Sequence, residues 1–298
     1  ARIGTESAFH MPAAAVIVIS CVLFGAAAAS AVSWVHHDLR PSCEEGLLDT
    51  EEVSLLQRGI AARSTRRGAH NASAGECASS ESLLFLHIPK TAGTVIEELA
   101  LQQGIKWGAN MSFDGCGVRS ERCPAWHLPP ASLPAPTIYD GREVFCVVRD
   151  PFDRLVSEYG HMVAHQEYAF DYADLIQRRG CAEEGLNEFL LSALGRVEGG
   201  ETMLQLCHFV PQSDYIWGPE GTSKPWCTDI IRYENLDAEF NALMERKGYS
   251  LRMGEERVNQ GACPSLTAQN LSQEVRRLAR VVYFRDFDAL NYSMNIGS

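Results

Sequence analysis

Two short apolar segments, each followed at once by a helical pattern, constrain the fold of this chain more than any other feature. Residues 83–87 (LLFLH) and 144–148 (VFCVV) are almost wholly apolar, so each suits a strand buried on both faces. Helical patterns follow at residues 94–103 and 151–166. Apolar strands that alternate with helices predict an α/β domain with a central parallel sheet flanked by helices.

The rest of the domain continues this alternation. We predict a further strand at residues 230–233 and further helices at residues 185–194, 201–206, 236–246 and 272–282. Residues 108–136 are rich in Gly, Pro and Cys and predict a long loop.

The N-terminal region predicts a membrane segment. Residues 11–35 carry no charged side chain, and as a helix they would measure about 37 Å, more than the ~30 Å hydrocarbon core of a bilayer. This length favours an uncleaved signal anchor. The small-x-small sequence Ala29-Ser30-Ala31 keeps a cleaved signal peptide open as the alternative. Both interpretations predict that the rest of the chain enters the secretory lumen.

The remaining boundaries follow from composition. Residues 1–10 would be a short tail, and residues 36–82, rich in Ala, Ser, Gly, Glu and Arg, predict a flexible luminal stem with a short helix at 47–60. The folded domain would occupy residues 83–298.

Net charge and cysteine content limit the classes of function and the cellular compartment that fit this chain. The 26 Lys and Arg against 38 Asp and Glu leave a net charge of −12, which argues against a general nucleic-acid binder. Nine of the ten cysteines lie beyond the membrane segment, and four Asn-x-Ser sequons begin at Asn71, Asn110, Asn270 and Asn291. Both features fit the secretory lumen, where cysteines form disulfides.

Spacing suggests particular cysteine pairs. Cys116 and Cys123 are close enough for a local bridge, and Cys207 and Cys227 bracket another loop. Because Cys146 lies inside an apolar run, we predict that it is a buried free thiol. The sequence has no Cys-x-x-Cys pair or zinc-type Cys/His spacing, so we predict no metal.

The first chemical motif is the sequence LFLHIPKTAGT at residues 84–94. A strand runs into a loop of small residues that opens a helix, so backbone N–H groups and the helix dipole would face an anion there. Lys90 adds a positive charge, and Thr91 and Thr94 add hydroxyl donors. The Walker A spacing is absent. The plain alternative is a strand–loop–helix connection with a Thr cap.

The second motif is the sequence FCVVRDPFDRLVSEY at residues 145–159. Arg149 ends a strand and can bind a phosphate through its guanidinium, and Pro151 suits the first helical turn. Ser157 follows two turns into the helix. For Asp150 and Arg154 we predict structural roles: they would cap the helix start and pair around it.

Together the motifs resemble those of Golgi carbohydrate sulfotransferases, notably the heparan sulfate 2-O- and 6-O-sulfotransferase branch. The resemblance implies a P-loop-like sulfotransferase fold and the donor 3′-phosphoadenosine 5′-phosphosulfate (PAPS), with no metal. It places Lys90 at the 5′-phosphate and bridging oxygen. It further implies donor contacts from a set of loop and helix residues: Thr91, Ala92, Gly93 and Thr94 at the 5′-phosphate, and Arg149 and Ser157 at the 3′-phosphate.

Weaker resemblances extend this similarity along the chain, over roughly residues 83–292. They comprise His208–Gln212, the Glu234-Asn-Leu end of a later strand, a C-terminal pattern from Tyr283 through Asp286 to Tyr292, and a nucleotide contact at Arg257 and Asn259.

Sulfuryl transfer needs a base for the acceptor hydroxyl, and a His or Glu is expected. His127 is our first choice, because the 2-O-sulfotransferase branch has a catalytic His in a comparable place before its 3′-phosphate motif. The alternative for His127 is a loop residue without a catalytic role. Three rivals follow the second motif, namely Glu158, His161 and His165. We expect His87 to have a structural role and His208 to line the acceptor cleft.

The resemblance implies a glycan or glycoprotein acceptor and a single-pass type II Golgi membrane protein with a luminal catalytic domain. The acidic charge balance disfavours the long basic groove that a heparan-modifying enzyme needs, so a neutral or lightly charged glycan fits at least as well. Two other classes stay open. A nucleotide kinase would need a Walker A loop, and a non-catalytic glycan-binding scaffold would not need Lys90.

Overall fold

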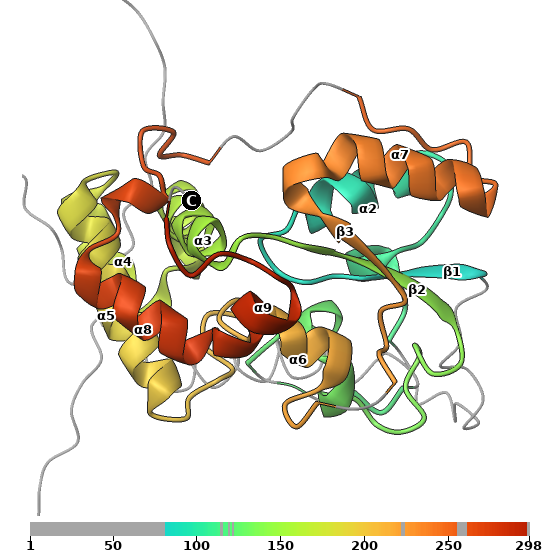
Figure 1. Cartoon of the computed structure of the whole chain (residues 1–298), viewed down its shortest axis with the longest axis horizontal. Coiled ribbons are helices and arrows are strands. Elements are labelled where there is room, and N and C mark those ends of the chain that lie inside the picture. The colour runs from blue at the N-terminus through green and yellow to red at the C-terminus, as the bar shows by residue number, and fades with distance from the viewer. Residues whose placement is uncertain are drawn as a thin grey trace, which may run out of the picture. The chain divides into compact units, whose positions relative to one another are not determined.

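A parallel three-stranded sheet organises the domain in the computed structural model (Figure 1). Its strands are β1 (Leu83–Leu86), β2 (Glu143–Val148) and β3 (Asp229–Arg232), in the order β1-β2-β3. Leu83 aligns with Glu143, and Phe145 aligns with Asp229. All three predicted strands are therefore confirmed, and β2 lies in the centre, where its apolar sequence is needed.

The structure describes residues 81–113, 116–118, 120, 122–221, 224–254 and 261–296, which belong to one compact unit that spans residues 69–298. The predicted membrane segment, the stem up to residue 80, and Arg257 and Asn259 lie outside these residues. Within them, no helix combines the length and apolar character needed to cross a membrane.

The helices follow the sequence pattern closely in the first half and last third of the domain. They are α2 (Gly93–Leu101), α3 (Pro151–Ala164), α4 (Ala173–Arg179), α5 (Glu183–Glu198), α6 (Gln212–Trp217), α7 (Leu236–Lys247), α8 (Gln273–Val282) and α9 (Phe284–Ala289). The short helices α4, α6 and α9 were not predicted, because six or seven residues are too few to show a helical period.

The alternation of side chains along each strand divides the core in two. Leu83 and Phe85 pack on one face with residues of α2 and α7, such as Ile96 and Phe240. The neighbouring strand residues face the other side, where α6 and the 123–139 segment cover them. Figure 1 shows α2 and α7 on one side of the sheet and α6 on the other. A third cluster joins helices α3, α4, α5, α8 and α9.

The predicted helix at 201–206 is wrong. The chain there makes a turn with three consecutive left-handed residues, Gln205 (φ 48°), Leu206 (φ 56°) and Cys207 (φ 69°). Left-handed backbone costs a non-glycine residue roughly 1–2 kcal/mol, so tertiary contacts must hold this turn. One of them is the disulfide from Cys207 to Cys123.

The predicted cysteine pairs are also wrong. Three disulfides join described residues, namely Cys123–Cys207, Cys146–Cys227 and Cys181–Cys263. The predicted free thiol at Cys146 is thus bonded, between the central strand and the segment before β3. Each bridge spans more than 80 residues, and such pairings follow from the fold rather than from spacing in the sequence.

Candidate active site

The loop from β1 to α2 has the backbone of an anion-binding site. Lys90 (φ 70°) and Ala92 (φ 78°) are left-handed, and α2 begins at Gly93 without any side-chain cap. The first N–H groups of α2 therefore have no capping side chain, and the helix dipole makes this end positive. The Thr91 hydroxyl is buried and donates to the Ile88 carbonyl at 2.8 Å, whereas Thr94 is exposed.

A glycine at position 93 is required by close packing against His87. A Cβ atom there would lie 2.2 Å from His87 Nε2. The His87 ring is held by Glu97, whose Oε1 lies 2.6 Å from Nδ1. This buried pair agrees with the structural role predicted for His87, which also borders the cavity described below.

Arg149, from the second motif, contacts the first motif. It follows β2, and its Nη1 donates to the Lys90 carbonyl at 3.4 Å. The guanidinium lies 4.1 Å from the ring centre of Tyr233. Its Nε is buried and has no hydrogen-bond partner among the described residues. Buried donors are normally satisfied, so this guanidinium fits an anionic ligand such as a phosphate.

The weaker sequence resemblances acquire a physical role around Arg149. Gln212 holds the Arg149 backbone on both sides, accepting from its N–H at 2.9 Å and donating to its carbonyl at 2.8 Å. Asp286 accepts from the Gln212 N–H at 2.8 Å. Glu234 accepts from the Asp150 N–H at 2.8 Å. Three segments far apart in the sequence therefore position one arginine.

The two residues given structural roles differ in what they do. Asp150 caps α3 as predicted, accepting from the N–H groups of Phe152 and Asp153. Arg154 does not pair at the helix start. It is buried and donates to the carbonyls of three residues that border the site, Pro89, His208 and Val210.

A cavity of about 620 Å³ opens beside Lys90. Its lining includes Thr94, Arg122, Trp126, Tyr168 and four histidines: His87, His127, His161 and His208. The imidazole rings are neighbours. The ring centre of His127 lies 4.8 Å from that of His87 and 5.0 Å from that of His208, and His161 lies 5.6 Å from His208.

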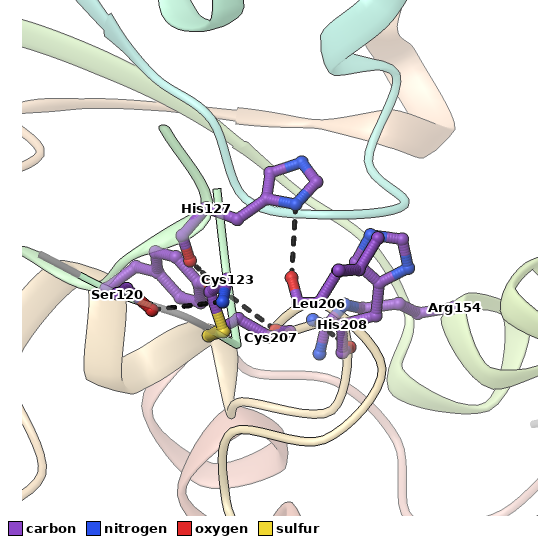
Figure 2. Close-up of a disulfide and its surroundings, with 8 residues drawn as sticks. Ser120, Cys123, His127, Arg154, Leu206, Cys207 and His208 are labelled. Atoms are coloured by element: carbon purple, nitrogen blue, oxygen red, sulfur yellow. Dashed lines mark hydrogen bonds between the residues drawn. A yellow bond between two sulfur atoms is a disulfide. The ribbon is translucent and has the colours of Figure 1, made fainter. Parts of the chain in front are cut away.

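His127 is held in the protonation state that a general base requires. Its Nδ1 lies 3.1 Å from the Leu206 carbonyl (Figure 2), which can only accept, so Nδ1 carries the proton and Nε2 is the basic atom. Burial, with the rings of His87 and His208 nearby, lowers the pKa of His127 well below its usual value. The Tyr215 hydroxyl donates to the His127 carbonyl at 2.8 Å and fixes the backbone.

Lys90 lines the cavity, and Glu158 is a buried carboxylate that contacts His208, another lining residue. Burial lowers the pKa of Lys90 to about 8; Glu158 opposes this shift, whereas Arg149 and Arg154 add to it. Glu158 Oε2 lies 2.7 Å from His208 Nδ1. Burial lowers the pKa of His208, so a neutral His208 donates its Nδ1–H to Glu158.

The other candidates are placed less favourably. His161 lines the cavity, and burial and Lys90 lower its pKa to about 3. His165 is exposed, and its Nδ1 lies 3.6 Å from a Glu167 carboxylate oxygen. Ser157 is half-buried on α3, two turns beyond Asp150.

Sequence reasoning missed one part of this site and reached another only through resemblance. The Leu206 carbonyl gives no signal in the sequence, because it is a backbone group in an irregular turn. Gln212 could be found only through its resemblance to a family motif. Among the described residues, no group of three or more His, Cys, Asp or Glu side chains is arranged to hold a metal ion.

Comparison with known proteins agrees with this geometry. The Sulfotransferase family model matches residues 77–293, which include both phosphate-type motifs, the cavity and the C-terminal helices. No curated protein and no solved structure matches the chain significantly. Sulfotransferases use PAPS as their donor. Because the matched region covers most of the chain, the protein belongs to the sulfotransferase family.

Proposed function

We propose that this protein transfers a sulfuryl group from PAPS to a hydroxyl of a glycan acceptor in the secretory lumen. The observation that carries the proposal is the contact between two motifs across 59 residues: Arg149 donates to the carbonyl of Lys90, and Lys90 lines the same cavity as His127. Membership of the sulfotransferase family supports sulfuryl transfer as the reaction.

The donor would lie across the two motifs. The open N–H groups at residues 92–94 and the Lys90 ammonium suit the 5′-phosphate, since both offer positive charge without a bulky side chain. Arg149, with its unsatisfied Nε, suits the 3′-phosphate. Ser157 is the second 3′-phosphate contact that we propose, from its place on α3.

The transfer itself would be an in-line displacement. His127 Nε2 takes the proton of the acceptor hydroxyl as its oxygen bonds to sulfur. The bond from sulfur to the bridging oxygen breaks, and the electron pair leaves with the nucleotide phosphate. The Lys90 ammonium stabilises that developing charge, the role that preorganised cations play in phosphoryl transfer.

The acceptor would enter past two aromatic residues at the cavity, the half-buried Trp126 and the exposed Tyr168. Arg122 is the exposed cation there. A single exposed cation among the described residues that line the cavity, on a chain of net charge −12, suits a neutral or lightly charged glycan better than a highly sulfated one. Membrane attachment through residues 11–35 and a Golgi location complete the proposal.

Calorimetric binding of 3′-phosphoadenosine 5′-phosphate to the disulfide-intact protein tests the donor site, with ATP and AMP as controls. We expect micromolar binding that requires the 3′-phosphate and is lost in Arg149→Ala. Transfer of labelled sulfate to neutral and acidic glycans then tests the acceptor. Absence of binding to folded protein would overturn the proposal and favour a non-catalytic glycan-binding role.

A further inference from the structure

Two of the histidines that line the cavity have their ring orientation fixed by an oxygen atom. His127 Nδ1 lies 3.1 Å from the Leu206 carbonyl, and His208 Nδ1 lies 2.7 Å from a carboxylate oxygen of Glu158. Carbonyl and carboxylate oxygens only accept, so Nδ1 donates in both rings. Burial lowers the pKa of both histidines. Each ring is therefore neutral, and its Nε2 is a hydrogen-bond acceptor.

The other two histidines of the cavity do not offer the same group. His87 also directs Nδ1 to a carboxylate oxygen, that of Glu97 at 2.6 Å. Its Nε2, however, lies against the start of α2, where a Cβ atom on Gly93 would be only 2.2 Å away. His161 lines the cavity, but no hydrogen bond among the described residues fixes its ring. A fixed and accessible acceptor nitrogen is thus particular to His127 and His208.

The rings of His127 and His208 are neighbours. Their centres lie 5.0 Å apart and their planes meet at 65° (Figure 2). Both residues line the cavity together with Lys90, so one ligand can meet both acceptor nitrogens. Two hydroxyls on adjacent carbons of a sugar ring are the matching donors, because each hydroxyl donates one hydrogen bond to an acceptor about 3 Å away.

We propose that His208 is a second acceptor-binding residue, whose Nε2 accepts from the hydroxyl next to the one that His127 deprotonates. The acceptor is then a sugar residue with free hydroxyls on two adjacent carbons. This inference rests on the proposed function, in which His127 is the base, and it narrows the class of acceptor. Glu158 acts through His208, as the positioning residue that fixes its tautomer.

The second hydrogen bond would orient the reacting oxygen. A sugar held by His127 alone can still turn about the bond between carbon and the reacting oxygen. A hydroxyl on the adjacent carbon, bound to His208, fixes the sugar ring relative to both the base and the donor sulfur. Orientation of this kind lowers the barrier to an in-line transfer. Because His208 is buried, an Nε2 left without a donor is costly, so the site should reject a sugar that lacks the second hydroxyl.

Methyl glycosides of glucose, galactose and N-acetylglucosamine are the acceptor probes, since each carries hydroxyls on adjacent carbons. Transfer of sulfate from PAPS, with the product mapped by NMR, identifies the hydroxyl that the wild type modifies. Deoxy forms of that sugar are then compared, lacking a hydroxyl either at an adjacent carbon or at a more distant one. We expect kcat/KM to fall about 10- to 100-fold for one adjacent deoxy form and less than about threefold for the distant one.

His208→Asn assigns the effect to this residue. The Asn amide keeps a donor for Glu158 near the place of Nδ1 and has no counterpart of Nε2. On the parent sugar this variant should lose about as much kcat/KM as the wild type loses on the adjacent deoxy form, and it should distinguish the two sugars by less than about twofold. His161→Asn is the matched control, because His161 lines the same cavity, and it should discriminate as the wild type does.

The outcomes distinguish this inference from the proposed function. If the wild type binds no 3′-phosphoadenosine 5′-phosphate, the proposed function itself fails. If it binds the nucleotide but modifies none of the probes, modifies only the primary hydroxyl, which has no hydroxyl on the neighbouring carbon, or accepts every deoxy form equally, the role of His208 is wrong. Loss of nucleotide binding in His208→Asn would place His208 at the donor instead. If thermal melting shows that this variant is unfolded, His208→Ala replaces it, and the wild-type comparison of deoxy sugars needs neither variant.

Discussion

The two walls of the cavity are built by different means. The donor wall consists of the strand–loop–helix connection 86–94, which lines the cavity at Lys90 and Thr94, backed by the connection 148–157, whose Arg149 contacts the Lys90 carbonyl. The base wall consists of His127, the Leu206 carbonyl and His208, which are joined by the Cys123–Cys207 disulfide across 84 residues. Local rules place Lys90 and Arg149 at two strand ends, although Gln212, from far along the chain, fixes the Arg149 backbone. The second wall exists only after the chain has folded.

The two walls also differ in where they place strained, left-handed backbone. The donor loop has left-handed backbone at Lys90 and Ala92, and Ala92 is the residue from which helix α2 begins. The base wall has three left-handed residues in a row that no helix or strand continues. A covalent bond and the Tyr215 hydroxyl, which donates to the His127 carbonyl and lies 3.2 Å from the Cys207 carbonyl, hold this turn instead. The base wall should therefore depend on oxidation and the donor wall should not.

The largest effect is expected on the donor wall. Lys90→Ala removes the charge at the leaving oxygen, and Arg149→Ala removes the guanidinium that has an unsatisfied Nε. Each should leave sulfate transfer undetectable, a loss of about 10³-fold or more. Arg149→Ala should also abolish calorimetric binding of 3′-phosphoadenosine 5′-phosphate. Retained transfer in Lys90→Ala would contradict the role given to this wall.

His127→Ala addresses the base wall alone. Loss of the general base should lower kcat by about 10²–10⁴-fold, while binding of 3′-phosphoadenosine 5′-phosphate stays within about twofold of the wild type. Full activity would move the base role to His208 or His161, which line the same cavity. His165→Ala is the control, since this residue is exposed.

Opening the disulfide of the base wall should sharpen the comparison. Cys123→Ala with Cys207→Ala should lower the free energy of unfolding by about 2–5 kcal/mol and lower kcat by about tenfold, with donor binding retained. The matched control is Cys181→Ala with Cys263→Ala, a bridge that spans 82 residues rather than 84.

The control should lose similar stability and keep its kcat, because neither Cys181 nor Cys263 lines the cavity, whereas Cys123 does. Equal losses of kcat in both double variants would mean that the turn at 205–207 does not depend on its own disulfide. Unfolding by denaturant and initial rates at saturating donor provide the two readouts.

The smallest effect concerns the acid side of the pH profile. Because the pKa of His127 is lowered in the folded protein, its Nε2 stays free of a proton as pH falls, and the base remains available. From pH 7.5 to 6.5 we expect kcat to fall by less than about twofold. A steep loss centred near pH 6.5, the ordinary value for histidine, would contradict the assignment of the base to the buried His127.

How much could be predicted from sequence follows the same division. The three strands, helices α2, α3, α5, α7 and α8, and the placing of Lys90 and Arg149 at the ends of two strands all agree with the expectations. These features depend on side-chain period and on turn chemistry over fewer than about 20 residues. Choosing His127 as base was possible only by resemblance, because nothing near it in the sequence indicates which carbonyl would orient its ring.

What the sequence determined by itself was the α/β class, the two anion-binding connections and the family resemblance. Only the tertiary structure decided the three disulfides that join described residues, the left-handed turn that replaces the helix expected at 201–206, and the pairs of Glu158 with His208 and Glu97 with His87. The reason is physical. A helix or a strand end is stabilised by neighbours in the chain, whereas a bridge, a strained turn or a buried carboxylate–histidine pair is stabilised by partners that folding brings together.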